Sequence, residues 1–431
     1  MKRLATSEPG FADAFARLLQ RRQQAGRSVF EPVASIIEQV RAGGDTALCA
    51  LTGRFDRLDL APGELRVGAA EIDAACAAIP AALQAALELA ARRIEAFHAL
   101  QRPADIDHHD AQGLRLGLRW TALDSVGLYV PGGTAAYPSS VLMNALPARV
   151  AGVGRIAMCV PTPEGRTNPL VLAAARLAGV DEIYRIGGAQ AIAALAFGTQ
   201  TVRPVDRIVG PGNAYVAEAK RQVSGVVGID SVAGPSEVVI IADDSAQPSH
   251  VALDLLAQAE HDEMAQSILI TTSEPLAAAV PGEVEAALAG LPRAAIAGAS
   301  WRDHGAIILC ASEAEAAELA NRLAPEHLQL MLRDPAAVFA AIRHAGAVFI
   351  GHDTPEAIGD YVAGPNHVLP TSGAARHASG LSIYDFLKRT TWIQATPSAL
   401  QAVGPACIAL AEAEGLDAHA RSVAVRLGRA T

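Results

Sequence analysis

One helical segment carries three polar side chains at a spacing that suits a metal site. In SHVALDLLAQAEHDEMA, Asp254, Gln258 and His261 are four and three residues apart, so in a helix they share one face. Such a stripe is more commonly the solvated side of a helix, and a metal site would need further ligands from distant segments. Imidazole and oxygen ligands suit zinc, which keeps one position open for substrate in catalytic sites.

Two distant segments offer such ligands. Asp360 lies in the Gly/Pro-rich stretch AIGDYVAGPNHVLPT, and His419 lies in LDAHARSV near the start of the last predicted helix. A single surface Asp or His is commonplace, so neither residue is diagnostic alone. Only convergence of these residues in space would establish a metal site.

An acid and an imidazole are adjacent in RLAPEHLQL, between a predicted helix and a predicted strand. These residues, Glu326 and His327, could serve as general acid and base, because histidine titrates near neutral pH. A solvated pair in a loop would give the same pattern, so both interpretations stay open at this point.

Three predicted strands end in glycine-rich turns that carry a polar side chain. The polar residues are Tyr129 in GLYVPGG, Gln190 in IGGAQAI and Asn213 in IVGPGNAY. Ligands bind outside the carboxyl ends of strands in open α/β sheets, and glycines let a ligand approach the backbone. One such turn is usually a tight connection, whereas three in one sheet predict a ligand-binding edge. The nearest match to GxGxxG, at Gly152 and Gly154, lies between a helix and a strand, so we interpret it as a helix-ending turn.

The elements that position these residues alternate between strand and helix from about residue 120, and the alternation restarts near residue 236. This pattern predicts an α/β fold class with two Rossmann-like parallel-sheet domains that lack the GxGxxG fingerprint, plus helical N- and C-terminal segments. Gly43 and Gly44 are expected to end one early helix, and Asp417 to cap the last. The tail shows no strand pattern. The expected division is a helical segment at 1–24, a discontinuous α/β domain at 25–120 and 236–381, a second α/β domain with the ligand-binding edge at 121–235, and a helical tail at 382–431.

The composition predicts a soluble globular protein. Of 431 residues, 51% are hydrophobic and 19% charged, which excludes a disordered chain. The net charge of −10 argues against a nucleic-acid partner. Five scattered cysteines without CxxC predict neither a disulfide framework nor a cysteine-rich zinc site. We find no signal-peptide pattern, and prolines interrupt the longest uncharged stretch, so we expect no membrane span and a cytoplasmic location.

Taken together, these segments resemble the histidinol dehydrogenase family from about residue 25 to the end of the chain. The resemblance is most specific in VGLYVPGGTAAYPSSVLMNALPARVAGV, GGAQAIAALAFGT, VGPGNAYVAEAKRQV, AGPSEVVIIAD and LAQAEHD. It is supported by LAPEHLQL, GDYVAGPNHVLPT and ARHASGLSIYDFLKRT. Strings of this length in this order are far more specific than a short motif.

The resemblance implies one active site assembled from all these segments. It implies one zinc ion per subunit, held by Gln258, His261, Asp360 and His419, and NAD+ contacts at Tyr129, Gln190 and Asn213. Glu326 and His327 would be the acid/base pair. Substrate contacts would come from Ser236, His327, His367 and Glu414 together with the zinc ligands.

Family members are domain-swapped homodimers, so the resemblance implies that His419 and Glu414 serve the site of the other subunit. The implied reaction is a four-electron oxidation of L-histidinol to L-histidine through bound L-histidinaldehyde, with two NAD+, at the end of histidine biosynthesis. His327 would accept the alcohol proton, and Glu326 would activate the water that hydrates the aldehyde.

Three alternatives stay open. A paralogue could act on another small polar alcohol such as a sulfonated diol, although Glu414 and the Glu326–His327 pair favour histidinol. A zinc hydrolase would use Glu326 to activate metal-bound water, but the chain has no HExxH motif. A non-catalytic module of two α/β lobes would leave the acid/base pair without a role.

Overall fold

Runs of consecutive apolar residues form a six-stranded parallel sheet in this computed structural model, which describes residues 1–20, 29–132, 137–232 and 234–429. Strands buried on both faces need apolar side chains at successive positions, as EVVIIA and QSILIT provide. The strand order is β1-β11-β10-β9-β12-β13, and every neighbouring pair is parallel. The strands are β1 (Lys2–Ala5), β9 (Glu237–Ala242), β10 (Gln266–Thr271), β11 (Ala306–Leu309), β12 (His327–Met331) and β13 (Ala347–Ile350).

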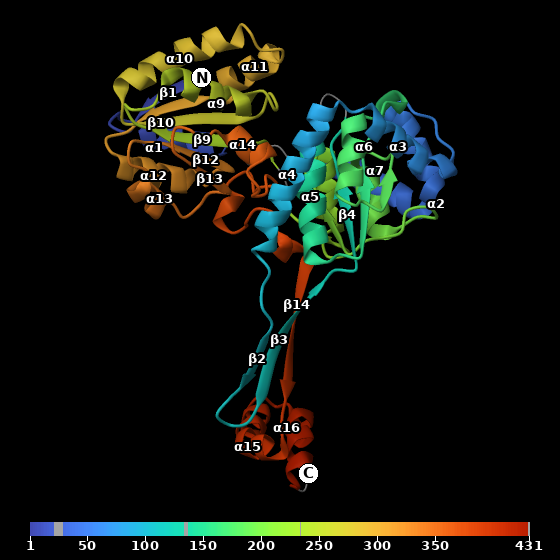
Figure 1. Ribbon diagram of the computed structural model, residues 1–431. Coiled ribbons are helices and arrows are strands. Elements are labelled where there is room, and N and C mark those ends of the chain that lie inside the picture. Colours follow the sequence, from blue (N-terminus) through green and yellow to red (C-terminus); the bar gives the residue numbers. More distant parts are fainter. Residues whose placement is uncertain (21–28, 133–136, 233, 430–431) are drawn as a thin grey trace.

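Helices cover both faces of this sheet (Figure 1). Helices α1, α12 and α13 pack on one face, and α9, α10 and α11 pack on the other. Two of them begin with a serine cap, because the hydroxyls of Ser273 and Ser312 accept a hydrogen bond from a backbone N–H in the first turn. The bounds are α1 (Phe11–Gln20), α9 (Pro248–Ala259), α10 (Glu274–Leu288), α11 (Ala294–His304), α12 (Glu313–Leu323) and α13 (Ala336–Ala341).

A second parallel sheet has five strands in the order β6-β5-β4-β7-β8. The chain leaves the central strand β4 toward β5 and β6 on one side and continues to β7 and β8 on the other. The strand order therefore reverses between β4 and β7, which is where sheets of this topology bind ligands. The strands are β4 (Ser125–Tyr129), β5 (Arg155–Cys159), β6 (Glu182–Tyr184), β7 (Arg207–Val209) and β8 (Gly228–Ile229).

Helices α2, α7 and α8 cover one face of the five-stranded sheet, and α3, α4, α5 and α6 cover the other. Gly152 ends α5 in a left-handed conformation with φ 95°, which confirms the interpretation of the GxGxxG-like segment as a helix-ending turn. The bounds are α2 (Phe30–Asp56), α3 (Ala69–Ala78), α4 (Ala81–Ala99), α5 (Pro138–Ala151), α6 (Pro169–Leu177), α7 (Gly188–Phe197) and α8 (Ala214–Val223).

The predicted helix end at Gly43 and Gly44 is a kink and not an end. Gly44 has φ 54° and ψ −134°, and the chain resumes helical geometry and continues to Asp56. A positive φ favours glycine, so the pattern correctly marked a break but not the restart beyond it.

Helices α2, α3 and α4, which the expected division groups with 236–381, contact α7, α6 and α5 on the five-stranded sheet. Helix α4 also contacts 236–381, because Arg93 donates to the carbonyls of Val362 and Ala363. The first residues are not a separate helical segment, because β1 pairs with β11 in the six-stranded sheet. A helical pattern shows that a helix has an apolar face but not which sheet that face covers. The expected boundary at residues 24 and 25 lies outside the described residues.

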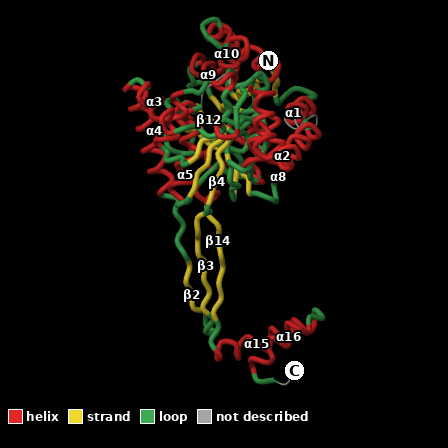
Figure 2. Tube along the Cα trace, turned by 90° about the vertical axis from the view of Figure 1, so that its right-hand side faces the viewer, coloured by secondary structure: helices red, strands yellow, loops and turns green. Residues whose placement is uncertain are grey.

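An antiparallel sheet of three strands, two of eight residues and one of four, forms a stalk below the two α/β units (Figures 1 and 2). Its strands are β2 (Ile106–His109), β3 (Arg115–Ala122) and β14 (Leu387–Gln394), with Leu387 opposite Ala122 and Gln394 opposite Arg115. The expectation of a tail without strands is therefore wrong for 387–394. The sequence LKRTTWIQ lacks a buried face, and its pairing depends on a partner strand that is distant in the chain.

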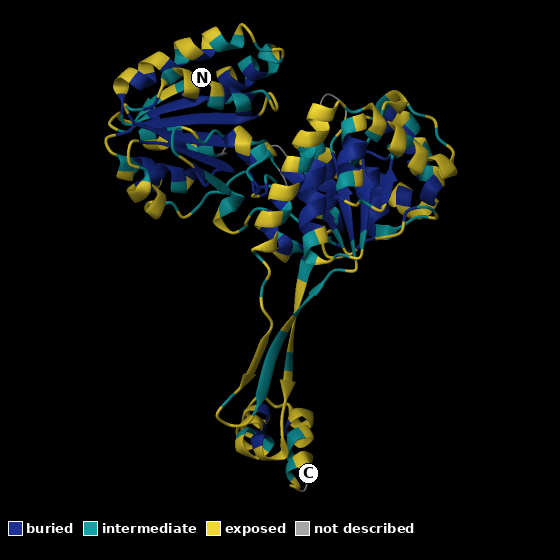
Figure 3. Ribbon diagram, in the orientation of Figure 1, coloured by how far each residue is buried: buried dark blue, intermediate teal, exposed yellow. Residues whose placement is uncertain are grey.

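Two helices, α15 (Pro397–Ala413) and α16 (Asp417–Ala424), lie at the far end of the stalk (Figures 1 and 2). Ile408, Ala411 and Ala420 are buried between them, whereas most of their other side chains are exposed (Figure 3). Asp417 is the first residue of α16 and not its cap, since Leu416 occupies the cap position. Its carboxylate still lies in the first turn, where the helix dipole favours negative charge.

Among the described residues, no single helix is both long and apolar enough to cross a membrane. The bent pair α3 and α4 passes that test together, by length and composition only.

Candidate active site

The predicted acid/base pair lies at the amino end of β12. His327 is the first residue of this strand and is opposite Val238 of β9, and Glu326 directly precedes it. Strands β9 and β13 flank β12 on its two sides, so side chains at its start are held inside the protein. Both side chains are buried, and the interpretation as a solvated loop pair is therefore wrong.

The imidazole of His327 has a defined orientation. Its Nδ1 lies 3.1 Å from the backbone carbonyl oxygen of Glu237, and the side-chain amide of Gln258 lies beside the same nitrogen, with its NH2 group best placed toward Glu356 and the Glu237 carbonyl. A carbonyl oxygen only accepts, so Nδ1 carries the proton and donates it, and Nε2 remains unprotonated. Nε2 is buried without a hydrogen-bond partner in the part of the chain that the structure describes. Burial lowers the pKa of His327 to about 3, so the ring is neutral and able to accept a proton.

The carboxyl group of Glu326 is held by two residues at the start of β9. Its Oε2 accepts a hydrogen bond of 3.0 Å from the backbone N–H of Glu237, and the hydroxyl of Ser236 donates to the same carboxyl group. Burial, with the nearby carboxyls of Glu237 and Asp360, raises the pKa of Glu326 well above its usual value despite these hydrogen bonds. Oε2 of Glu326 lies 3.7 Å from Nδ1 of His327, so the acid and the base lie next to each other.

A short helix, α14 (Glu356–Tyr361), brings two more carboxyl groups to His327. Glu356 and Asp360 are four residues apart and share a helix face. Glu356 Oε1 lies 3.5 Å from Nδ1 of His327, and Asp360 Oδ1 lies 3.9 Å from Nε2. Burial raises the pKa of Asp360 to about 7, and burial with the neighbouring carboxyls raises that of Glu356 well above its usual value.

The residues of this cluster fit a metal ion. One ligand atom from each of His327, Glu356 and Asp360 lies within 4.8 Å of the others. Glu356 Oε2, like Nε2 of His327, is buried with no partner among the described residues. A cation bound beside His327 would offset the crowding of carboxyl groups and satisfy the unpartnered oxygen of Glu356, while Nε2 of His327 stays available to accept a proton.

The carboxyl end of α9 reaches the same place. Gln258 is fully buried and contacts His327, so the polar stripe of α9 is not its solvated side at this position. His261 follows the end of the helix and is exposed, yet it is close enough to lower the pKa of His327. Asp254 turns toward β12 and accepts a hydrogen bond of 2.8 Å from Gln329.

A cleft of about 410 Å³ opens onto the cluster. Its polar lining includes His327, Asp360 and His367, and its apolar lining includes Phe349 and Leu369. His367 is oriented by the backbone carbonyl of Asp360, 3.0 Å from its Nδ1, and burial lowers its pKa to about 4. The cleft has the size and mixed lining of a site for a small polar molecule.

Two predicted site residues lie far from this cluster within one chain. Glu414 follows the end of α15 and His419 lies in α16, at the tip of the stalk, whereas β12, α9 and α14 belong to the α/β units (Figures 1 and 2). Both residues are exposed. The single chain therefore brings Gln258 and Asp360 to His327 and places His261 just past the end of the helix that carries Gln258, but it leaves His419 and Glu414 apart from them.

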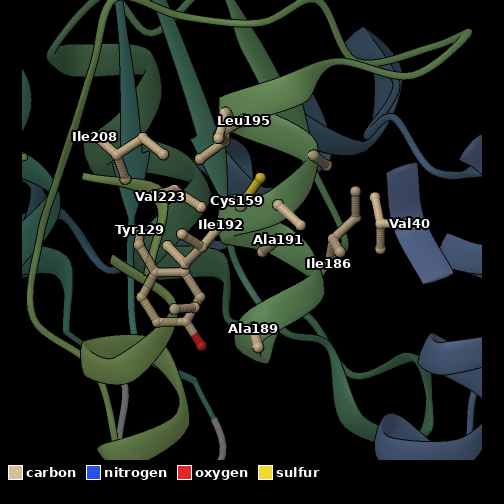
Figure 4. Close-up of a cluster of buried hydrophobic side chains, with 14 of the residues drawn as sticks. Val40, Tyr129, Cys159, Ile186, Ala189, Ala191, Ile192, Leu195, Ile208 and Val223 are labelled. Carbon is tan, nitrogen blue, oxygen red and sulfur yellow. The ribbon is translucent and has the colours of Figure 1, made fainter. Parts of the chain in front are cut away.

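The three predicted cofactor contacts lie at the carboxyl edge of the five-stranded sheet. Tyr129 is the last residue of β4, Gln190 lies in the first turn of α7, and Asn213 caps α8 through its side-chain oxygen. Tyr129 is packed in the apolar cluster beside Ile192 (Figure 4), and its hydroxyl accepts a hydrogen bond of 3.1 Å from the N–H of Gly188. Burial raises the pKa of Tyr129 to about 12.

Two backbone segments approach each other closely at the carboxyl ends of β4 and β7, where the strand order reverses. Gly210 has φ 113°, and a Cβ atom there would lie 2.1 Å from the carbonyl oxygen of Tyr129. The ammonium group of Lys220 donates a hydrogen bond of 3.0 Å to the backbone carbonyl of Gly210. The carboxylate of Asp230 accepts one of 2.8 Å from the backbone N–H of Gly210. Lys220 and Asp230 also form a buried ion pair with each other. Glycine at position 210 is therefore required by the close packing of the segment after β7 against the end of β4.

Glu356 is a residue of the candidate site that the sequence analysis missed. Its signal is the spacing of Glu356 and Asp360, which places two acids on one face only if the segment is a helix. The Gly/Pro-rich composition of AIGDYVAGPNHVLPT hides this helix, and six residues give too little periodicity to predict it.

Comparisons with known proteins agree over nearly the whole chain. The family described as histidinol dehydrogenase matches residues 19–427. The chain is 65% identical to histidinol dehydrogenase of Gluconobacter oxydans over 427 residues, covering 99% of each chain, and 60% identical to that of Cereibacter sphaeroides, covering 99% of this chain and 98% of the relative. The crystal structure of histidinol dehydrogenase from Elizabethkingia anophelis superposes with a TM-score of 0.94 at 39% identity, covering 99% of this chain and 98% of that one.

Proposed function

Because the chain belongs to the histidinol dehydrogenase family of NAD-dependent oxidoreductases, we propose that it converts L-histidinol to L-histidine in a four-electron oxidation with two NAD+. The observation that carries the proposal is the buried Nε2 of His327, which has no hydrogen-bond partner among the described residues and lies at a cleft beside the buried carboxyl group of Glu326. An alcohol oxidation needs such a base, and the second oxidation needs a group that activates water.

In the proposed sequence, Nε2 of His327 accepts the hydroxyl proton of histidinol as the carbon loses hydride. Bound NAD+ supplies the hydride acceptor in each of the two oxidations. His327 then releases the hydroxyl proton to solvent, and the ionised form of Glu326 removes a proton from the water that adds to the aldehyde carbon. In the second oxidation the neutral His327 takes a proton of the resulting hydrate as the carbon loses hydride. Burial of both side chains keeps the reactive aldehyde away from bulk water.

We further propose a zinc site made of Gln258, His261 and Asp360 from one chain and His419 from a second copy. The contact of Gln258 with His327 and the approach of Asp360 to the same ring support the first part. The stalk supports the second, because it projects His419 and Glu414 away from their own α/β units (Figure 1). A zinc ion there would position the imidazole and amino nitrogens of the substrate and favour ionised carboxyl groups. Glu414 would pair with the charged amine.

Binding of NAD+ at Tyr129, Gln190 and Asn213 completes the proposal. Their common place at the carboxyl edge of the five-stranded sheet, on both sides of the switch point, supports it. The cysteines of the described chain are all free, which fits a reducing compartment such as the cytoplasm.

The deciding experiment counts NADH formed per L-histidinol, before and after removal of metal with a chelator and again after zinc is restored. We expect two NADH per histidinol, loss of turnover on chelation and recovery with zinc. A sulfonated diol serves as the comparison substrate. Turnover of the diol without turnover of histidinol would assign the chain to a paralogous activity, and full activity after verified metal removal would refute the zinc site.

A further inference from the structure

Asp56, the last residue of α2, is buried and has one carboxylate oxygen without a hydrogen-bond partner among the described residues. Its exposed fraction is 9%, and the unpartnered oxygen is Oδ2. It lies at the carboxyl end of a helix, where the dipole disfavours negative charge. Burial raises its pKa, and we find no cation or hydrogen bond in the described chain that lowers it. Burial and the helix dipole both disfavour the ionised carboxylate, and no cation or hydrogen bond among the described residues offsets them. Such a group is expected to bind a ligand.

The carboxylate lies at the edge of the five-stranded sheet that carries the proposed NAD+ contacts. A Cβ atom on Gly187 would lie 3.4 Å from Oδ2 of Asp56 and 2.5 Å from Cβ of Pro161, which follows β5. The charge of Asp56 adds to burial in raising the pKa of Tyr129. The buried hydroxyl of Thr162 also has no partner among the described residues. Thr162 follows Pro161 in the chain, so the segment after β5 carries a second unsatisfied polar side chain.

The chemistry of this place matches a ribose. Gly187 has no side chain between the sheet edge and Asp56, and a carboxylate accepts hydrogen bonds from two neighbouring hydroxyls at once. Parallel sheets that bind NAD+ carry such an acid near the strand beside the central one, where it binds the 2′-hydroxyl of the adenosine ribose. Here β5 is the strand beside the central β4, and Pro161 at its end lies next to Asp56. The 2′-phosphate of NADP+ at the same point would be repelled by the negative charge of Asp56, and the repulsion would be strong because the site is poorly solvated.

We propose that Asp56 binds the hydroxyls of the adenosine ribose of NAD+ and thereby sets the preference for NAD+ over NADP+. The inference rests on the proposed function only in that NAD+ binds at this edge of the sheet. Asp56 is a specificity-determining residue in this view, and it takes no part in hydride or proton transfer.

The test measures binding and stability, without turnover. NADH and NADPH are titrated by calorimetry into the metal-loaded, full-length enzyme in the absence of histidinol. The variants are Asp56→Asn, Asp56→Ala and, as the matched control, Asp59→Asn, which removes the same charge from an exposed position three residues away. The thermal midpoint of each protein is recorded without nucleotide.

We expect Asp56→Asn and Asp56→Ala to weaken NADH binding about 10- to 100-fold, the effect of losing hydrogen bonds to a charged group. NADPH binding should weaken less or improve, so the NADH/NADPH ratio falls. The thermal midpoint without nucleotide should stay equal or rise, because an uncompensated buried charge is removed. Asp59→Asn should change none of these.

Unchanged NADH affinity would overturn the proposal, and so would a lowered thermal midpoint with an unchanged nucleotide preference, which indicates a structural role. Equal weakening of NADH and NADPH would overturn the assignment to the adenosine ribose. A wild-type enzyme that binds no NADH would instead overturn the proposed function, so the two failures are distinguishable.

Discussion

Nδ1 of His327 lies 3.1 Å from the backbone carbonyl oxygen of Glu237, on the neighbouring strand of the sheet. This contact fixes the tautomer, because the carbonyl can only accept and the proton must stay on Nδ1. The free nitrogen, Nε2, is then the one near Asp360. The parallel register of β9 and β12 thus determines which atom of the ring can act as a base.

The first prediction concerns this base. Replacing His327 by asparagine should lower kcat by about 10²- to 10⁴-fold, the usual contribution of a positioned general base. The fold should persist, because an amide can still donate to the Glu237 carbonyl. Steady-state NADH formation and circular dichroism measure the two effects, with His377→Asn as the control at an exposed histidine. Retained activity in His327→Asn would remove His327 from the mechanism.

The second prediction separates the two oxidations. In Glu326→Gln the first hydride transfer should proceed, whereas hydration of the aldehyde should be slowed about 10²- to 10⁴-fold, because the amide cannot remove a proton from water. Single-turnover absorbance should therefore show one NADH per active site instead of two. If both NADH appear at the wild-type rate, water activation must be assigned to another group.

The parallel sheets could be predicted because their signal is local. Strands such as EVVIIA are apolar throughout, and the helices between them are long enough to repeat their pattern. The packing of α2, α3 and α4 on the other sheet could not be predicted, because it depends on contacts between distant segments. The strand β14 was missed for the same reason, since its register comes from β3 and not from its own sequence.

The candidate site shows the same limit. Glu326, His327, Gln258 and Asp360 could be named from the sequence because the family resemblance covers them. Glu356 could not, because its role depends on a short helix that turns it toward His327. Which side chains meet in a site depends on the fold. The spacing of residues in the sequence predicts such a meeting only where the local secondary structure is also predicted correctly.

The third prediction concerns the close backbone approach at the switch point. Gly210→Ala should destabilise the protein by several kcal/mol, on the order of the cost of a strained backbone plus a steric clash, since the new Cβ would lie 2.1 Å from the Tyr129 carbonyl oxygen. Gly225→Ala is the matched control, because Gly225 also has a positive φ, 101°, but nothing within 4 Å of its Cβ position. Urea unfolding gives both values. Equal destabilisation by the two variants would show that strain alone, without the clash, accounts for the effect.

The fourth prediction is a pH dependence of stability. Glu182 is buried, but hydrogen bonds from Arg155, Arg203 and Tyr184 outweigh the burial and lower its pKa to about 2. A carboxyl with a depressed pKa in the folded state stabilises the fold above its ordinary pKa near 4.5, and this stabilisation is lost as the pH falls toward 2.

Glu182→Gln should therefore lower the free energy of unfolding by about 3 kcal/mol at pH 7 and by much less at pH 2. Urea unfolding at several pH values measures this, with the exposed Glu38→Gln as the control. A variant whose stability falls as steeply as that of the wild type between pH 5 and pH 2 would contradict the role of Glu182.

The last prediction tests whether the tail serves a second copy. His419→Ala and Glu326→Gln should each form no histidine alone. The first lacks a zinc ligand, and the second cannot complete the second oxidation. In a mixed dimer, however, one site would combine the intact Glu326 of one chain with the intact His419 of the other. If chains associate at random, half of the dimers are mixed and each has one intact site, so co-expression should restore about a quarter of wild-type histidine formation. If each tail served its own chain, every site would carry one of the two defects and no activity would return.

Zinc content provides an independent measure, since it should fall in His419→Ala and recover at one site per mixed dimer. The distance between α16 and its own α/β units, visible in Figure 1, is the structural reason to expect recovery.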